Sequence, residues 1–264
     1  MAELNVYTVT STADTATNPA QGTLRYGLVN AVANSYDKIV FDSTVFPANT
    51  QTTILLAAQL EAPARDLIID GGATWTVNYV WRGEDNNKTR VFIDENNPAQ
   101  EGEEIKTLLR TRVVLDAQAQ TYRCLIGAAA NKINVSGVTF ARGKLSGSSY
   151  GAGVYTRNSA ASGKNVFTDC TFDSCAATNG GGLYSYNTSQ NTLENCTFDS
   201  CAANNGGGLF SYNTSQNTLE NCTFDSCAAT YGGGLYSYNT SQNTLGNCTF
   251  DSCAATYGGG LYSY

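Results

Sequence analysis

The fold of this chain is decided by the stretch FDSCAATNGGGLYSYNTSQNTLENCT, from Phe172 to Thr197. FDSCAANNGGGLFSYNTSQNTLENCT follows from Phe198 to Thr223, and FDSCAATYGGGLYSYNTSQNTLGNCT follows from Phe224 to Thr249, without a gap between copies. A fourth copy runs from Phe250 to Tyr264. A fixed period of about 20 to 50 residues is typical of solenoids and related repeat arrays.

Each 26-residue unit has the pattern of short strands separated by turns. TLENCTF and GGGLYSY are alternating segments bounded by Gly, Asn, Asp and Ser, which favour turns. Such a unit cannot bury its own apolar face, so it must stack on its copies, with like residues in ladders about 4.8 Å apart. A propeller blade needs about 40 residues and a leucine-rich repeat needs its own consensus. We therefore predict an all-β protein, a parallel β-helix.

The repeat extends upstream in weaker form. INVSGVTFARGKLSGSSYGAGVYTR, residues 133–157, has the same order of features. Residues 66–72, 89–94, 112–117 and 122–128 are predicted to form earlier, irregular rungs, with an inserted loop at 95–104. An amphipathic helix is expected within residues 22–35, where Leu24, Leu28, Val29 and Val32 have helical spacing. We expect a helical N-terminal cap in residues 1–60, irregular rungs in 61–164 and a regular shaft in 165–264.

Composition and charge narrow the classes of partner. The 264 residues carry a net charge of −7, and no Lys or Arg follows Lys164. An acidic repeat without cations does not attract nucleic acid or anionic lipid. The sequence has no His, which removes the usual base at neutral pH and the commonest zinc ligand, so no cofactor or metal is predicted. No apolar run of about 18 residues predicts a membrane span, and the first ten residues do not resemble a signal peptide.

The repeated motif F-x-x-C-x-A-x-x-x-G-G-G-L-Y resembles the F-x-x-N-x-A…G-G-A-I-Y repeat of polymorphic outer-membrane and autotransporter-like surface proteins. The N-terminal YTVTSTAD…GTLRYGLVNAV…DKIVFD is similar to the cap that opens many bacterial β-helix surface proteins. The resemblance implies a pectin-lyase-like right-handed parallel β-helix that is secreted or displayed on the cell surface. In this chain Cys replaces the Asn of the family motif, and a third Gly replaces the small Ala.

Eight cysteines are predicted to form two columns along the shaft. Their five-residue spacing within a rung does not fit a C-x-x-C redox or zinc motif. The rung spacing lies within the Cα separation of a disulfide, so bridges along a column or across one corner are both conceivable. The alternative is a column of buried thiols that pack as small hydrophobes. The disulfide candidates are Cys170, Cys175, Cys196, Cys201, Cys222, Cys227, Cys248 and Cys253, and Cys124 is left over.

Aromatic residues form two further columns. If Leu183 and its equivalents point inward, strand alternation directs both columns outward on one face. Such a face could bind a glycan or a neighbouring fibre, and the alternative is that the rings only stabilise one another. The first column is Tyr184, Phe210, Tyr236 and Tyr262, and the second is Tyr186, Tyr212, Tyr238 and Tyr264.

Asparagine, glycine and threonine also recur once per rung. The asparagines are expected to stack as amide ladders, although each also begins an N-x-S/T glycosylation sequon. The glycine runs, such as 180–182, indicate a backbone bend with tight stacking rather than a phosphate-binding loop. Ice binding by Thr188, Thr192 and their copies is a less favoured alternative, because the T-x-T pattern is missing. The asparagine columns are Asn187, Asn213 and Asn239, and Asn195, Asn221 and Asn247.

The sequence does not indicate an active site. Asp173 and its copies form one column without a cationic partner, whereas a lyase or hydrolase needs a local departure from the repeat. The charged residues Asp70, Arg82, Asp85, Arg90, Asp94 and Arg112 could meet on one face, but nothing in their spacing demands it, and ordinary surface charge is the favoured explanation. We predict a non-enzymatic structural or adhesive β-solenoid outside the cell, with head-to-tail or lateral self-association or a glycan partner. The alternative is a carbohydrate-binding or polysaccharide-lyase-like β-helix.

Overall fold

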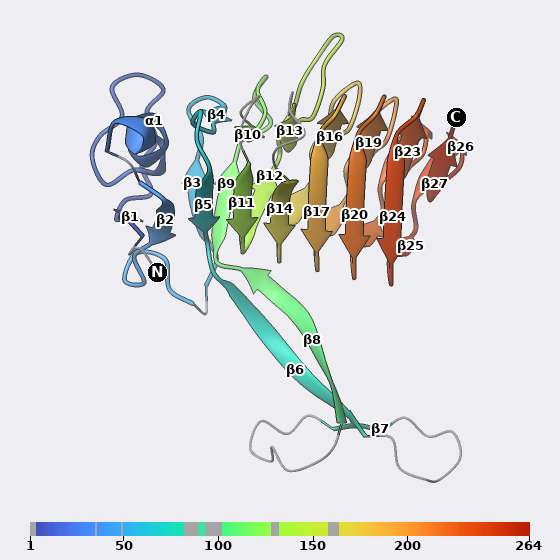
Figure 1. The fold of residues 1–264 in the computed structure, drawn as a ribbon, viewed down its shortest axis with the longest axis horizontal. Helices are drawn as coiled ribbons and strands as arrows, with labels where there is room; N and C mark the ends of the chain where they lie inside the picture. Colours follow the sequence, from blue (N-terminus) through green and yellow to red (C-terminus); the bar gives the residue numbers. More distant parts are fainter. Residues whose placement is uncertain are drawn as a thin grey trace.

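A computed structural model of the chain describes residues 4–34, 36–48, 50–81, 90–92, 102–127, 132–157 and 164–264. These residues wind into a β-solenoid with three parallel sheets along its length (Figure 1). Sheet A consists of β1 (Val6–Val9), β2 (Lys38–Phe41), β5 (Leu67–Asp70), β11 (Ile133–Ser136), β14 (Lys164–Thr168), β17 (Gln190–Glu194), β20 (Gln216–Glu220) and β24 (Gln242–Gly246).

The other two sheets complete each rung. Sheet B consists of β3 (Thr52–Leu55), β9 (Val113–Asp116), β12 (Val138–Ala141), β15 (Thr171–Asp173), β18 (Thr197–Asp199), β21 (Thr223–Asp225) and β25 (Thr249–Asp251). Sheet C consists of β4 (Leu60–Glu61), β10 (Leu125–Ile126), β13 (Val154–Thr156), β16 (Leu183–Tyr186), β19 (Leu209–Tyr212), β23 (Leu235–Tyr238) and β27 (Leu261–Ser263). In the last two rungs, β22 (Ala228–Tyr231) and β26 (Ala254–Tyr257) form an additional two-stranded parallel sheet.

Successive repeats lie directly over one another. Leu183 pairs with Leu209 and Leu209 with Leu235, so the register between rungs equals the sequence period. The prediction of an all-β parallel solenoid is confirmed. The weak upstream copy is also a rung, because Phe140 pairs with Phe172 and Tyr155 with Tyr184.

The core is built from identical side chains stacked along the solenoid. Phe198 is fully buried, and its ring lies 4.5 Å from that of Phe172 and 4.6 Å from that of Phe224, with planes within 4°. Leu193 and Leu219 fill the core from sheet A. Offset or parallel ring stacking adds to the burial of apolar area, so each rung stabilises its neighbours.

The glycine runs fix how closely the rungs approach. Gly206 has φ +63°, a left-handed conformation that favours glycine. A Cβ atom on Gly207 would lie 2.4 Å from the carbonyl oxygen of Gly233, and one on Gly208 would lie 2.6 Å from the Phe224 ring. The interpretation of the runs as tightly stacked bends agrees with these contacts.

The irregular region contains both rungs and an excursion. The segments predicted at 66–72, 112–117 and 122–128 contain β5, β9 and β10 of the solenoid. The segment at 89–94 is not a rung: β7 (Arg90–Phe92) pairs antiparallel with β6 (Ala73–Trp81), which also pairs with β8 (Gly102–Thr111). This three-stranded sheet projects from the solenoid (Figure 1). Of the loop predicted at 95–104, residues 95–101 lie outside the described ranges.

The predicted helix forms, but one residue of its predicted apolar face, Val29, points outward, and the side chain of Val32 lies outside the described residues. α1 (Leu24–Asn34) begins after Thr23, whose hydroxyl accepts a hydrogen bond from the amide of Tyr26 at 3.2 Å. Leu24 and Leu28 are buried, but Val29 is 65% exposed, because Ala31 takes the inward position instead. α1 covers the N-terminal end of the solenoid (Figure 1).

A buried ion pair connects the capping region to the first rungs. Arg25 contacts Asp14 at 2.7 Å, and the same guanidinium donates to the carbonyl oxygens of Ala58 and Gln59. The two carbonyl acceptors lie in the turn before β4, so the cap is fixed by charge-assisted hydrogen bonds as well as by apolar packing.

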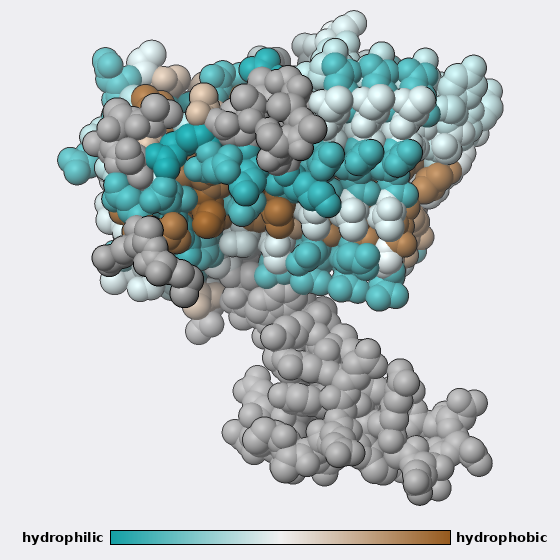
Figure 2. Space-filling model, in the orientation of Figure 1, coloured by the Kyte–Doolittle hydropathy of each residue, from teal (hydrophilic) through white to brown (hydrophobic). Residues whose placement is uncertain are grey.

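The outer surface of the shaft follows the same regularity. Figure 2 shows hydrophilic and near-neutral rows crossing the shaft, with a hydrophobic strip at its C-terminal end. There Leu261 is 43% exposed, whereas its equivalent Leu235 is fully buried. The side chains of the last rung therefore have a rung on one side only.

Replacing Gly207 by Ala tests the close approach of the rungs. The new methyl group would meet backbone carbonyls of the next rung, which cannot rotate away, so we expect a loss of about 3 kcal/mol in the free energy of unfolding. Urea unfolding followed by circular dichroism measures it. Asn204→Ala, at an exposed position of the same turn, is the control, and equal stability of the two variants would contradict the proposed packing.

Candidate functional site

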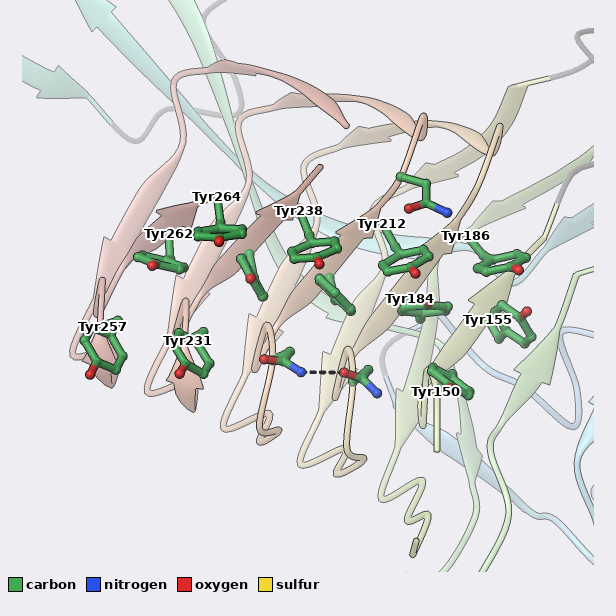
Figure 3. Close-up of a pocket in the computed structure, with 15 residues that line it drawn as sticks. Tyr150, Tyr155, Tyr184, Tyr186, Tyr212, Tyr231, Tyr238, Tyr257, Tyr262 and Tyr264 are labelled. Carbon is green, nitrogen blue, oxygen red and sulfur yellow. Dashed lines mark hydrogen bonds between the residues drawn. The ribbon is translucent and has the colours of Figure 1, made fainter. Parts of the chain in front are cut away.

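A groove lined by aromatic side chains runs along sheet C. Its volume is about 1040 Å³, and Figure 3 shows two rows of rings along its sides. It extends over five rungs, from Tyr155 through Tyr184, Phe210 and Tyr236 to Tyr262. The lining residues are Tyr150, Tyr155, Asn179, Tyr184, Tyr186, Asn205, Phe210, Tyr212, Asn213, Tyr231, Tyr236, Tyr238, Tyr257, Tyr262 and Tyr264.

Strand alternation places both predicted aromatic columns in this groove. Leu183 and Ser185 point into the solenoid and are fully buried, so Tyr184 and Tyr186 point away from its core. The first column is nevertheless buried: Tyr184, Phe210 and Tyr236 are 2%, 4% and 6% exposed. The expectation of two exposed columns on one face is therefore wrong for the first column, which is covered by the rings on either side.

The opposite wall comes from the residue before each glycine run, which sequence reasoning missed. Parallel bridges align these residues from rung to rung. The two asparagines are joined by a 2.6 Å hydrogen bond from Nδ2 of Asn205 to Oδ1 of Asn179 (Figure 3). A signal was present, because this position changes from Asn to Tyr between otherwise near-identical repeats. The column is Tyr150, Asn179, Asn205, Tyr231 and Tyr257.

The rings of the second aromatic column form a continuous offset stack. The ring centroids of Tyr186 and Tyr212 lie 5.8 Å apart, and those of Tyr212 and Tyr238 lie 5.5 Å apart, with planes within 5°. Tyr238 and Tyr264 continue the row (Figure 3). Each ring therefore shares its faces with neighbouring rungs.

The groove is uncharged and rich in hydroxyl groups. All of its described lining residues are Tyr, Phe or Asn. Burial raises the pKa of Tyr236 to about 12 and raises the pKa of Tyr184 still further. The phenols of Tyr184 and Tyr236 therefore stay protonated. Within the described residues, none of these hydroxyls forms a hydrogen bond with another protein group. None of them is among the fully buried polar atoms that lack a partner.

Cations lie beside the N-terminal end of the groove, where Arg157 and Arg123 both act on the Tyr155 phenol. The guanidinium of Arg123 lies 5.3 Å from the centroid of the Tyr155 ring and donates to the carbonyl oxygens of Tyr150 and Gly151. The positive charge of Arg123 is therefore already paired with groups of the protein itself.

Both expected amide ladders are present. Asn213 donates to Asn187 at 2.9 Å, and Asn239 donates to Asn213 at 2.8 Å. The Asn195, Asn221 and Asn247 column has the same arrangement at 3.3 Å. All six of these residues adopt the left-handed conformation that Asn tolerates at the corners of a rung.

A third amide ladder lies inside the solenoid and was not predicted. Nδ2 of Asn191 contacts Oδ1 of Asn217 at 2.7 Å, and both side chains are at most 2% exposed. Ser185 and Ser211 hydrogen-bond the same amides. Because a buried amide must be fully paired, this ladder is structural. The clue was the QNTLE segment, in which Asn and Leu share one face of the strand.

Comparison with known families identifies the fold class. The family profile described as "Right handed beta helix region" matches residues 124–264, more than half of the chain. The chain belongs to the right-handed β-helix family. Its three parallel sheets have the pectin-lyase-like architecture that the sequence resemblance implied. No curated protein matches the sequence. Within the described residues, the chain has no α-helix that is long and apolar enough to cross a bilayer.

The cysteines of the β-helix form two internal columns of reduced thiols. Cys196 contacts the thiols of Cys170 and Cys222, and burial raises its pKa. Cys170 and Cys175 lie at opposite ends of β15, roughly 10 Å apart, which is too far for a bridge within one rung. Pairing within a column is the arrangement that this geometry permits.

Cys124 is not an isolated cysteine. Its thiol hydrogen-bonds that of Cys175, so it heads the second column. Sequence spacing concealed this contact, because Cys124 reaches the column from a different side of its rung, immediately before β10.

The charged residues considered for an active site are not brought together. Asp70 pairs with Lys38 at 2.7 Å, and Arg112 donates to the carbonyl oxygens of Phe41 and Gly71. Arg82, Asp85 and Asp94 lie outside the described ranges, as does the side chain of Arg90. Asp173 and its copies accept hydrogen bonds from the adjacent serines. In the described part of the β-helix, no cluster of three metal-ligating side chains forms.

The raised pKa values of Tyr184 and Tyr236 predict late ionisation of these two groove tyrosines. An unfolded tyrosine ionises near 10.0, so between pH 10 and about 12 the unfolded chain loses the proton first and stability falls as pH rises. Below pH 10 this contribution is fully present. Absorbance titration at alkaline pH should show a late phase that Tyr236→Phe reduces. Simultaneous ionisation of all tyrosines near pH 10 in the folded protein would contradict it.

The thiol columns predict a defined oxidised form. In an oxidising compartment, we expect four bridges within columns and one remaining thiol among the nine cysteines. Intact mass after alkylation in denaturant should then show one addition without reductant and nine with it. Nine additions in both conditions would show that the columns remain reduced.

Proposed function

We propose that this β-helix is a non-enzymatic structural and adhesive module outside the cell, which binds an uncharged, extended polymer along the tyrosine groove. The observation that carries the proposal is the groove itself, continuous over five rungs and lined without a charged side chain. A concave site of aromatic residues with convergent polar groups is the usual form of a binding surface. The resemblance to polymorphic surface proteins supports the extracellular location.

The chemistry of the groove favours binding over catalysis. Hydrolysis or elimination needs an acid or base whose pKa lies near the working pH. The groove offers phenols whose pKa values are raised, such as Tyr184 and Tyr236. It also repeats similar groups on every rung, so no single position is distinguished for reaction.

The same chemistry argues against a polyuronate substrate. Binding a carboxylate in this groove would remove it from water without a cationic partner, which is costly. The phenols and amides can instead hydrogen-bond a neutral chain. The lyase-like alternative therefore has less support than an adhesive role.

Self-association of the β-helix remains part of the proposal. Like side chains recur on every rung of the shaft, so two copies lying side by side could repeat one contact along their length. Sedimentation velocity over rising concentration tests this role independently of ligand binding. A chain that stays monomeric throughout would exclude it.

Retention on immobilised polymers tests the binding function. We expect the chain to bind uncharged polymers better than polygalacturonate or heparin, with little effect of salt because no ion pair forms. Tyr212→Ala with Tyr238→Ala should weaken retention about tenfold or more, since two rings and hydroxyls are lost. Gln216→Ala, on sheet A of the same rung, is the matched control.

Two results would contradict the proposal. One is equal retention of the double variant and the parent chain. The other is release of unsaturated products from polygalacturonate, detected by ultraviolet absorbance, which would show that the chain is a lyase.

A further inference from the structure

We propose that the occupant of the tyrosine groove is an uncharged, proline-rich peptide in the polyproline II conformation. The inference rests on the proposed binding function and names its ligand class. Aromatic-lined grooves bind this conformation because its backbone is preformed and loses little entropy on binding.

Hydrogen-bond complementarity is the first argument. A proline-rich strand offers carbonyl acceptors and few N–H donors, and polyproline II leaves those carbonyls without internal partners. The groove supplies the opposite set, because its phenol hydroxyls, such as those of Tyr186 and Tyr212, have no partner within the described residues. The Asn205 amide lies on the facing wall.

Charge leads to the same class of ligand. The described lining contains no Lys, Arg, Asp or Glu, so an ionised side chain in the groove would be desolvated without compensation. Proline carries no charge and little side-chain entropy, and its ring is apolar. A proline-rich segment thus matches both the aromatic and the neutral character of the walls.

The spacing of the rungs fits the period of the peptide. One turn of polyproline II rises about 9.3 Å in three residues, and two rungs rise about 9.6 Å. Residues i and i+3 of the peptide would therefore meet equivalent rings two rungs apart, such as Tyr186 and Tyr238. Five rungs span about 19 Å, the length of about six residues.

Ring geometry favours the peptide over a neutral glycan. A sugar ring packs best on an open aromatic face. Here the centroids of Tyr186, Tyr212 and Tyr238 lie 5.5 to 5.8 Å apart in near-parallel planes, so the faces are shared within the row. The edges and hydroxyls of the rings remain for the ligand, and these suit a strand of prolines and carbonyls.

The facing wall begins with Tyr150 and then has an amide segment followed by an aromatic segment. Asn179 and Asn205 form the amide segment, and Tyr231 and Tyr257 form the aromatic segment, whose ring centroids lie 4.9 Å apart. Because the chain carries both residue types at this repeat position, exchanging them should not disturb the fold. This position is therefore assigned as the determinant of affinity for proline.

The exchange variants provide the test, with fluorescence anisotropy of a labelled ten-proline peptide added to the full chain. We expect Tyr231→Asn with Tyr257→Asn to weaken binding about tenfold, and Asn179→Tyr with Asn205→Tyr to tighten it about threefold or more. Replacing Tyr186, Tyr212 and Tyr238 by Phe should weaken binding about tenfold through lost hydroxyls. Phe210 already occupies one ring position of the groove, which indicates that such changes are tolerated. Tyr26→Phe, in α1, is the matched control.

A glycine-serine peptide of equal length and a neutral hexasaccharide complete the experiment. The inference fails if the glycine-serine peptide binds as well as the ten-proline peptide, or if the exchange variants leave peptide binding unchanged. Binding of the hexasaccharide without the peptide would overturn the peptide assignment and leave the proposed groove function intact. Binding of neither would overturn both.

Discussion

The in-register pairing of each rung with the next is the interaction on which the whole β-helix depends. A side chain at Gly207 or Gly208 would prevent this pairing. Because both positions are glycine, they leave room for the backbone of the following rung. Once the rungs lie in register, every position of the repeat becomes a column. Ring stacking of Phe198 and amide pairing of Asn217 then reinforce the same alignment from inside.

The same constraint produces the candidate site. Inward Leu183 and Ser185 require Tyr184 and Tyr186 to face away from the core, and stacking converts one pair of residues into two rows. The rows become a groove because the residues before the glycine runs form a second wall. A repeat that stacks in register thus also presents a long, uniform surface, which suits a long and uniform ligand better than a single reacting group.

Regularity and irregularity have different roles along the chain. In the shaft, neutral and acidic columns recur without a cation, and the thiols of Cys196 and Cys201 are buried where their pKa values are raised. Ionised partners gather nearer the N-terminus, where Arg25, Asp14, Asp70 and Lys38 fix the cap and the first rungs. Ion pairs therefore stabilise the N-terminal end of the solenoid, and contacts between like side chains of successive repeats stabilise the shaft.

The sequence by itself determined the period and the parallel stacking, because an exact repeat with alternating strands leaves few other ways to bury apolar area. It could not show that Cys124 joins a thiol column, that residues 90–92 belong to an antiparallel sheet, or that Tyr231 faces Tyr236 across a groove. Those contacts join positions whose separation depends on where each corner turns. Only the tertiary structure fixes the corners, through left-handed residues such as Asn195 and Ser200.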